Sequence, residues 1–181
     1  MRKQFFATIM LAAIFFGSYA QSGKNKISFG IKGGYNHTVI NGYETNGDKT
    51  GYVGSSIYGS LFSEMGISEN KFLGAELAFS WINDWHFLEI PIHFREMLNS
   101  RISIFAGPKL DLAADKFDKT KESESRLFGI SAEVGSQYDF SRHLFAEVKY
   151  SIGVTRNFND AFFDINNGRR NNFRFGAGYR F

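Results

Sequence analysis

The feature that most constrains this chain is an alternation of apolar and polar residues with a period of two, which recurs in eight segments after residue 25. Polar, glycine-rich or asparagine-rich stretches separate the segments, and the chain after its N-terminal stretch shows no helical periodicity. The pattern predicts an all-β protein of eight antiparallel up-and-down strands. The predicted strands lie near residues 26–39, 51–62, 71–82, 86–97, 101–114, 126–140, 143–157 and 172–181.

The predicted connections differ in length at the two ends of the sheet. Longer ones at 41–50, 115–125 and 158–171 share an end with a short one at 83–84, whereas tight turns at 99–100 and 141–142 belong to the other end. The link 63–70 departs from this rule because it is longer than a two-residue turn. Long loops at one end and short turns at the other are typical of outer-membrane β-barrels.

The two faces of the predicted strands have different chemistry. One face carries no charge and includes Ile31, Leu77 and Val148. The other face carries His93 and a balanced set of six acids and six permanent bases, which we expect to pair with one another inside a narrow lumen and so close it. This predicted charge network consists of Lys32, Glu76, Glu89, Arg95, Lys109, Asp111, Glu133, Asp139, Glu147, Lys149, Arg174 and Arg180.

Glycine usage favours placing the charged face inside. Ten glycines, Gly135 and Gly178 among them, share the charged face, and small residues beside long charged ones suit the filled interior of an eight-stranded barrel. Aromatic residues near the strand ends of the apolar face suit the two membrane interfaces. We therefore predict an eight-stranded transmembrane β-barrel in contact with outer-membrane lipid. A soluble, secreted, lipocalin-like ligand-binding barrel, with the apolar face as its core, stays open as an alternative.

The N-terminal twenty residues predict an export signal. Arg2 and Lys3 precede an apolar run over 5–16, and Ser18-Tyr19-Ala20 supplies the small residues of a cleavage site, so we expect a signal peptide over 1–20 and one barrel domain over 21–181. Of the 21 Lys and Arg residues, two lie in this signal, which leaves 19 against 18 Asp and Glu. Without a basic stripe, nucleic-acid binding is not expected.

Two prolines conflict with the strand pattern. Pro91 and Pro108 fall inside predicted strands, where each removes a hydrogen-bond donor from the ladder. We expect a β-bulge or a strand end at each of them, with a possible shift of face at Glu89, His93 and Arg95.

Few residues suggest a catalytic or metal-binding site. The chain has no cysteine, its four histidines lack metal-ligand spacing, and no catalytic, cofactor or metal site is predicted. Asp84 and His86, with Ser80 nearby, leave a rim-active hydrolase or acyltransferase as a further alternative. Phe162, Phe163 and Ile165 are apolar residues in the polar loop 158–171, which makes this loop the candidate surface for partner proteins.

Several short motifs resemble a known family. They are Phe29-Gly-Ile-Lys-Gly-Gly-Tyr-Asn36, Leu88-Glu-Ile-Pro-Ile92, Phe105-Ala-Gly-Pro-Lys109 and Phe173-Arg-Phe-Gly-Ala-Gly-Tyr-Arg-Phe181. Their order resembles the PorT-like small outer-membrane barrels of Bacteroidetes, which share the OmpA/OmpX type of eight-stranded barrel.

The resemblance implies an outer-membrane barrel with both termini in the periplasm and no catalytic residues. It also implies that Phe181, with Tyr179 and Phe175, forms the signal read by the barrel-assembly machinery. Other envelope proteins, including proteins of secretion, are the partners that it suggests.

Overall fold

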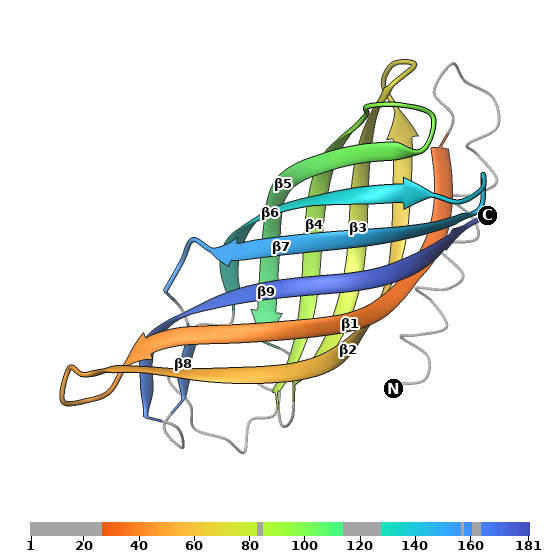
Figure 1. Ribbon diagram of the computed structural model, residues 1–181. Coiled ribbons are helices and arrows are strands. Elements are labelled where there is room, and N and C mark those ends of the chain that lie inside the picture. Colours follow the sequence, from red (N-terminus) through yellow and green to blue (C-terminus); the bar gives the residue numbers. More distant parts are fainter. Residues whose placement is uncertain (1–26, 83–84, 114–127, 157, 161–163) are drawn as a thin grey trace, which may run out of the picture.

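The computed structural model describes residues 27–82, 85–113, 128–156, 158–160 and 164–181, and within them every strand pairing is antiparallel. The predicted signal peptide and the whole of the predicted loop 115–125 lie outside these residues. Strands β1–β7 and β9 form a closed eight-stranded barrel, in which β9 pairs with β1 (Figure 1). The strands are β1 (Ile27–Tyr43), β2 (Lys49–Gly66), β3 (Lys71–Ile82), β4 (Trp85–Met97), β5 (Ile102–Ala113), β6 (Phe128–Asp139), β7 (Leu144–Gly153), β8 (Phe158–Asp160) and β9 (Ile165–Arg180).

The predicted all-β barrel of eight antiparallel strands is confirmed, but three neighbouring strands are longer than predicted. Strands β1, β2 and β9 contain 17, 18 and 16 residues, whereas β3–β7 contain 10 to 13. The predicted loop over 41–50 is in fact a hairpin turn over 44–48. Most of the predicted loop over 158–171 belongs to β8 and β9. In the added part of β9, polar side chains replace the apolar alternation on which the prediction relied.

The extra length forms a sheet that extends beyond the rest of the barrel. At its tip, β1 pairs with both β2 and β9, and the short β8 pairs with β9 (Figure 1). Strand β2 pairs with β3 only over Tyr58–Gly66. Among the described residues, the segment 53–57 of β2 therefore has a strand neighbour only in β1, and it forms an open edge of the protruding sheet.

The opposite end of the barrel carries three turns of the same kind. Each turn has four residues, at 67–70, 98–101 and 140–143. In each, the first amide donates to the carbonyl of the residue that begins the next strand: Ile67 to Lys71, Leu98 to Ile102 and Phe140 to Leu144, at 2.8–2.9 Å. The link after β2 thus follows the short-turn rule, because β2 continues to Gly66.

Neither proline produces the expected bulge or strand end. Strand β4 runs through Pro91 and β5 runs through Pro108, and the cross-strand register is the same on both sides of each proline. The missing donors interrupt the ladder locally, between Ala75↔Ile92 and Ala78↔Glu89 and between Pro91↔Lys109 and Phe94↔Ala106. Because the register does not shift, Glu89, His93 and Arg95 all stay on the inner face.

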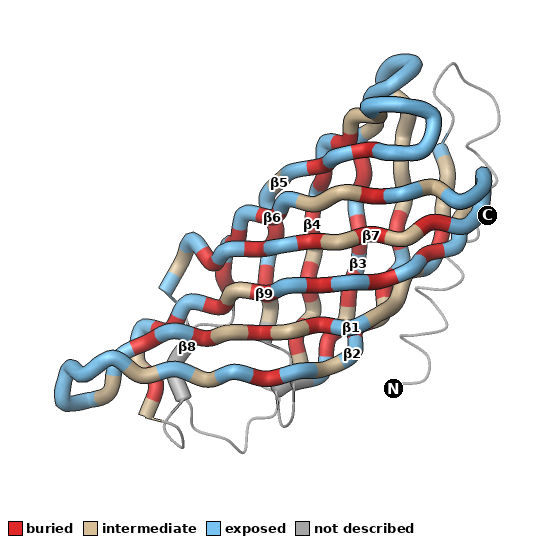
Figure 2. Tube along the Cα trace, in the orientation of Figure 1, coloured by how far each residue is buried: buried red, intermediate tan, exposed pale blue. Residues whose placement is uncertain are grey.

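Burial alternates along the strands with the period of the sequence pattern. Figure 2 shows buried and exposed residues alternating around the barrel wall. The exposed positions are occupied by apolar side chains such as Ile57, Val134 and Phe175, and the buried positions largely by polar and charged ones. In the described part of the chain, no helix has the length and apolar character needed to cross a membrane.

Candidate functional site

The barrel interior contains many buried polar and charged side chains. Even-numbered residues of β1, β3 and β9 and odd-numbered residues of β4–β7 point inward. The structure places all twelve residues of the predicted charge network on this inner surface, together with His93. Their ion pairs fall into two groups, which we call the central cluster and the mouth cluster.

One half of the central cluster is a ring of alternating charge. Lys32 lies 3.1 Å from Glu76 and 3.0 Å from Glu147, and Lys149 lies 3.0 and 2.9 Å from the same two carboxylates. The Tyr58 hydroxyl donates to Glu147 at 3.2 Å. Each cation therefore bridges two carboxylates, which is the arrangement that offsets the cost of burying a charge.

Glu89 is the centre of the other half. This fully buried carboxylate accepts from Lys109 at 2.8 Å, from Arg170 at 2.9 Å and from Arg174. Asp111 lies 3.1 Å from Arg170 and 3.2 Å from Lys109. Side chains from β4, β5 and the distant β9 thereby meet at one carboxylate.

His93 and Glu133 link the two halves. The His93 Nε2 atom lies 2.8 Å from Glu133, and the same carboxylate is 3.9 Å from Lys109 and 4.0 Å from Lys149. The imidazole packs against the ring of Phe105, with centroids 4.8 Å apart. The central cluster is therefore continuous across the lumen.

The mouth cluster lies at the end of the barrel that carries the four-residue turns. Arg95 forms a bidentate pair with Glu64, with Nε and Nη2 at 2.7 and 2.9 Å from its two oxygens. Arg180 lies 3.5 Å from Glu64 and 3.5 Å from Asp139. These four residues define the mouth cluster.

Two lumenal charges were missed by the sequence analysis. Glu64 and Arg170 lie beyond the predicted ends of β2 and β9, although their parity matches that of their inward neighbours. With them, the paired charges in the described lumen comprise seven acids and seven permanent bases. They are Glu64, Glu76, Glu89, Asp111, Glu133, Asp139 and Glu147, and Lys32, Arg95, Lys109, Lys149, Arg170, Arg174 and Arg180.

Aromatic rings fill the space between the charges, which the sequence analysis did not predict. Phe145 is fully buried and meets Phe62 edge-on, with centroids 5.6 Å apart. The Lys32 ammonium lies 4.8 Å from the Phe62 ring, and the Arg170 guanidinium lies 3.7 Å from the Phe87 ring. In such cation–π contacts, an aromatic ring fills the space beside a buried cation and also stabilises its charge.

Inward glycines provide the room for these rings. A Cβ atom on Gly178 would overlap the Phe145 ring, one on Gly135 would overlap the Phe105 ring, and one on Gly30 would overlap the Phe62 ring. These glycines therefore allow close packing, because the ring from one strand occupies the space that a side chain of another strand would need.

The remaining predicted site residues lie elsewhere. Phe175, Tyr179 and Phe181 point outward and are 59%, 46% and 71% exposed. Phe162 and Phe163 lie outside the described residues. Ile165, expected in the loop contact surface, is instead buried at 1% exposure, because it begins β9 and packs over Gly42.

The structure does not bring together the two candidate rim residues that it describes, Ser80 and His86. The Ser80 hydroxyl is buried in the lumen and donates to Glu89 at 2.8 Å, whereas the His86 ring stacks on the outward Phe79, with centroids 6.0 Å apart. Ser80 and His86 thus lie on opposite sides of the barrel wall, and Asp84 lies outside the described residues. The described residues also include no group of three or more potential metal ligands.

Comparison with solved structures relates this fold to known outer-membrane barrels. The attachment invasion locus protein Ail of Yersinia pestis, solved with the heparin analogue sucrose octasulfate, aligns with a TM-score of 0.52 at 14% identity over 86% of this chain and 99% of its own. Neisserial surface protein A aligns with a TM-score of 0.54 at 12% identity over 84% of this chain and 97% of its own. No protein-family model matches the sequence, and no curated protein matches it significantly.

The arrangement of the two faces places the chain in a membrane. A closed barrel satisfies its backbone within the wall, and an apolar outer surface over a charged interior is stable only where the outside meets hydrocarbon. The protein is thus an outer-membrane β-barrel. The soluble lipocalin-like alternative is wrong, because it requires the apolar face to be the core, and that face is the exposed one.

Proposed function

We propose that this protein is a non-enzymatic outer-membrane barrel whose lumen is closed by its own side chains, and that it acts through surfaces outside the membrane. The observation that carries the proposal is the neutral network of paired charges that crosses the lumen. A diffusing ion would have to displace buried ion pairs whose partners would then lack compensation. Between the two clusters, a cavity of about 10 Å³ leaves room for a single water.

Conductance across a planar lipid bilayer tests the closed lumen. The wild-type barrel is expected to give no ion-conducting steps. A variant in which Lys32, Glu76, Glu147 and Lys149 are all replaced by serine loses two acids and two bases together, so it removes one half of the central cluster without leaving an unpaired charge. This variant should conduct, provided that it keeps the heat-dependent gel mobility of a folded barrel. Steady current steps from the wild type would refute the proposal.

The protruding sheet supports a role in contacts with other proteins. Segment 53–57 of β2 forms its open edge, and Val53 and Ile57 are 62% and 67% exposed. No charged residue occurs between Lys49 and Glu64, although charged side chains are a common means of protecting an edge against pairing. An uncharged open edge suits the addition of an extended segment from a partner.

Photo-crosslinking in cells tests this contact surface. A benzophenone amino acid at Val53 samples the edge, and the same group at its cross-strand neighbour Val39 samples the interior of the same sheet at the same height. We expect adducts with an envelope or secretion protein from position 53 and far fewer from position 39. Equal yields at both positions, or none, would contradict an edge contact. The PorT-like motifs make protein secretion the process in which we place such a partner.

The loop residues Phe162 and Phe163 lie outside the described residues and stay separate candidates for partner contact.

The outward residues Phe175, Tyr179 and Phe181 support the proposed recognition by the barrel-assembly machinery. Replacing Phe181 by alanine should lower the amount of folded protein in the outer membrane. Phe140→Ala is the matched control, because Phe140 is also exposed and lies in a turn at the same end. An equal loss in both variants would show that any aromatic residue at this end matters, and would remove the specific role of Phe181.

A further inference from the structure

A cavity of about 440 Å³ opens at the end of the barrel that carries the four-residue turns. The mouth cluster forms its inner part, and the turns after β4 and β6 form its rim. Its charged lining consists of Glu64, Arg95, Arg101, Asp139, Arg142 and Arg180. A volume of this size is within the range of ~300–1,000 Å³ that is typical of small-molecule sites.

The charges of this cavity are not balanced, unlike those deeper in the lumen. Four guanidinium groups face two carboxylates. Arg101 donates to the neutral Tyr138 hydroxyl at 3.2 Å, and the Arg142 side chain forms no ion pair or hydrogen bond with the described residues. The lining therefore has an excess of two positive charges.

Arg180 adds hydrogen-bonding capacity at the inner side of the cavity. Its contacts with Glu64 and Asp139 measure 3.5 Å, and its contact with the Arg142 carbonyl measures 3.3 Å. These distances exceed the 2.7–2.9 Å of the Arg95–Glu64 pair and the usual range of charge-assisted bonds. Arg180 can therefore donate to an additional acceptor, while Arg95 is already satisfied.

We infer that this cavity binds a phosphate group, with Arg101, Arg142 and Arg180 as its donors. A phosphate monoester carries a charge of about −1.5 to −2 at neutral pH, which matches the excess in the lining. The guanidinium fork is suited to bidentate contact with phosphate oxygens. Phe72, Met97 and Phe140 also line the cavity and would contact the organic part of the ligand. The phosphate monoester can belong to a soluble ligand or to a lipid with a monoester headgroup, since the short turns of such barrels face the periplasmic leaflet.

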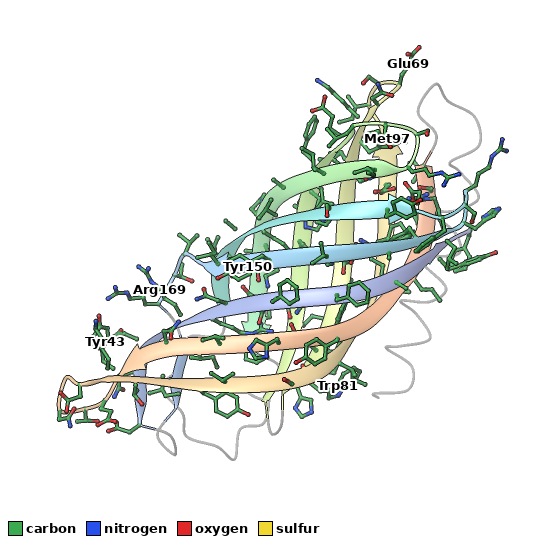
Figure 3. The ribbon with its side chains drawn as sticks, in the orientation of Figure 1. Tyr43, Glu69, Trp81, Met97, Tyr150 and Arg169 are labelled. Atoms are coloured by element: carbon green, nitrogen blue, oxygen red, sulfur yellow. The ribbon has the colours of Figure 1, made fainter. Side chains whose placement is uncertain are left out.

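Calorimetric titration of the full-length mature barrel in a phosphate-free detergent tests the site. Inorganic phosphate and glycerol 3-phosphate are the probes, and saturable binding with a Kd of about 1 mM or tighter is expected. The double variant Arg101→Gln, Arg142→Gln should weaken binding by about tenfold or more, because it removes two charge-assisted donors. Arg169→Gln is the control: Arg169 is an exposed arginine of β9 near the opposite end of the barrel, and its replacement should change nothing (Figure 3).

A second arm distinguishes the two sources of phosphate. The same titration is repeated in nanodiscs that contain phosphatidic acid, whose headgroup is a phosphate monoester. Loss of glycerol 3-phosphate binding there identifies the lipid headgroup as the occupant, and retained binding identifies a soluble ligand. The inference is overturned if neither probe binds in detergent, or if Arg169→Gln weakens binding as much as the double variant does. Closure of the lumen to ions is independent of either result.

Discussion

Glu89 is the residue on which most lumenal charge converges. Its carboxylate accepts from Lys109, Arg170 and Arg174 and is fully buried. Glu89→Gln keeps the shape of the side chain but leaves these cations undercompensated, so it should lower the free energy of unfolding by about 3–5 kcal/mol. Urea unfolding in lipid vesicles measures the change. Glu69→Gln, at an exposed turn position, is the control and should have little effect (Figure 3); a small effect of Glu89→Gln would show that the network tolerates an unpaired cation.

Replacing Gly178 by alanine tests how closely the aromatic rings pack against the barrel wall. An added methyl group would overlap the buried Phe145 ring, so Gly178→Ala should lower the free energy of unfolding by about 1–3 kcal/mol. A methyl group on the outward Gly59 would meet nothing within 4 Å. The same unfolding measurement on Gly59→Ala should therefore show a much smaller change. Equal losses would mean that glycine acts here through strand propensity rather than through space.

At the scale of residues, the alternation of the sequence and the glycine content of the charged face were enough to predict that the charged side chains within the predicted strands face the lumen. Lys109 and Glu133 follow directly from the period of two, because one step along a strand reverses the face. The partners could not be predicted in this way. Glu89 meets Arg170 only because β9 pairs with β1 on one side and β7 on the other, and this closure follows from the register of the whole barrel.

At the scale of elements, the turn after β1 is tied to the start of β9. The Thr45 hydroxyl donates to Asp164 at 2.7 Å, and the Thr45 amide donates to the same carboxylate at 3.1 Å. These bonds stabilise the ionised form and hold the pKa of Asp164 below its ordinary value of 3.8. Because the pKa is lowered in the folded state, the stabilisation is complete above pH 3.8 and is lost as the pH falls through the lowered pKa.

An NMR titration of the Asp164 carboxyl carbon tests this link between elements. Thr45→Val removes the hydroxyl donor and should raise the pKa of Asp164 towards 3.8. The exposed Asp48, in the same turn and without a bond to Thr45, provides the internal reference. If the pKa of Asp164 is the same in both proteins, the Thr45 hydroxyl does not hold the carboxylate.

The elements that the sequence analysis located least well are those that leave the apolar band. The ends of β1, β2 and β9 carry polar residues such as Asn41, Thr50 and Arg170. Because these residues do not alternate with apolar ones, the sequence pattern does not show that the strands continue. Pro91 and Pro108 led to the opposite error, because a bulge or strand end was predicted at two positions where the strand continues. Each costs one ladder bond, but the neighbouring strands on both sides hold the register, so a closed barrel absorbs the loss without a bulge.

At the scale of the molecule, composition and closure are linked. A lumen narrow enough to be filled needs small residues where rings cross, and a lumen that contains seven acids needs as many bases. The outward positions then need only be apolar, and the contacts that we propose lie at the two ends. One end presents the protruding sheet (Figure 1), and the other presents the arginine-lined cavity.

The most direct test of the account asks which alanine methyl groups touch lipid. Ala75 and Ala78 lie on the same strand, the first exposed and the second fully buried, and Ala132 and Ala177 are exposed on β6 and β9. In nanodiscs containing a lipid with a nitroxide on its acyl chain, the methyl NMR signals of Ala75, Ala132 and Ala177 should broaden, while that of Ala78 stays sharp. Broadening of Ala78 with the other three unaffected would show that the apolar face is the core and would contradict the account.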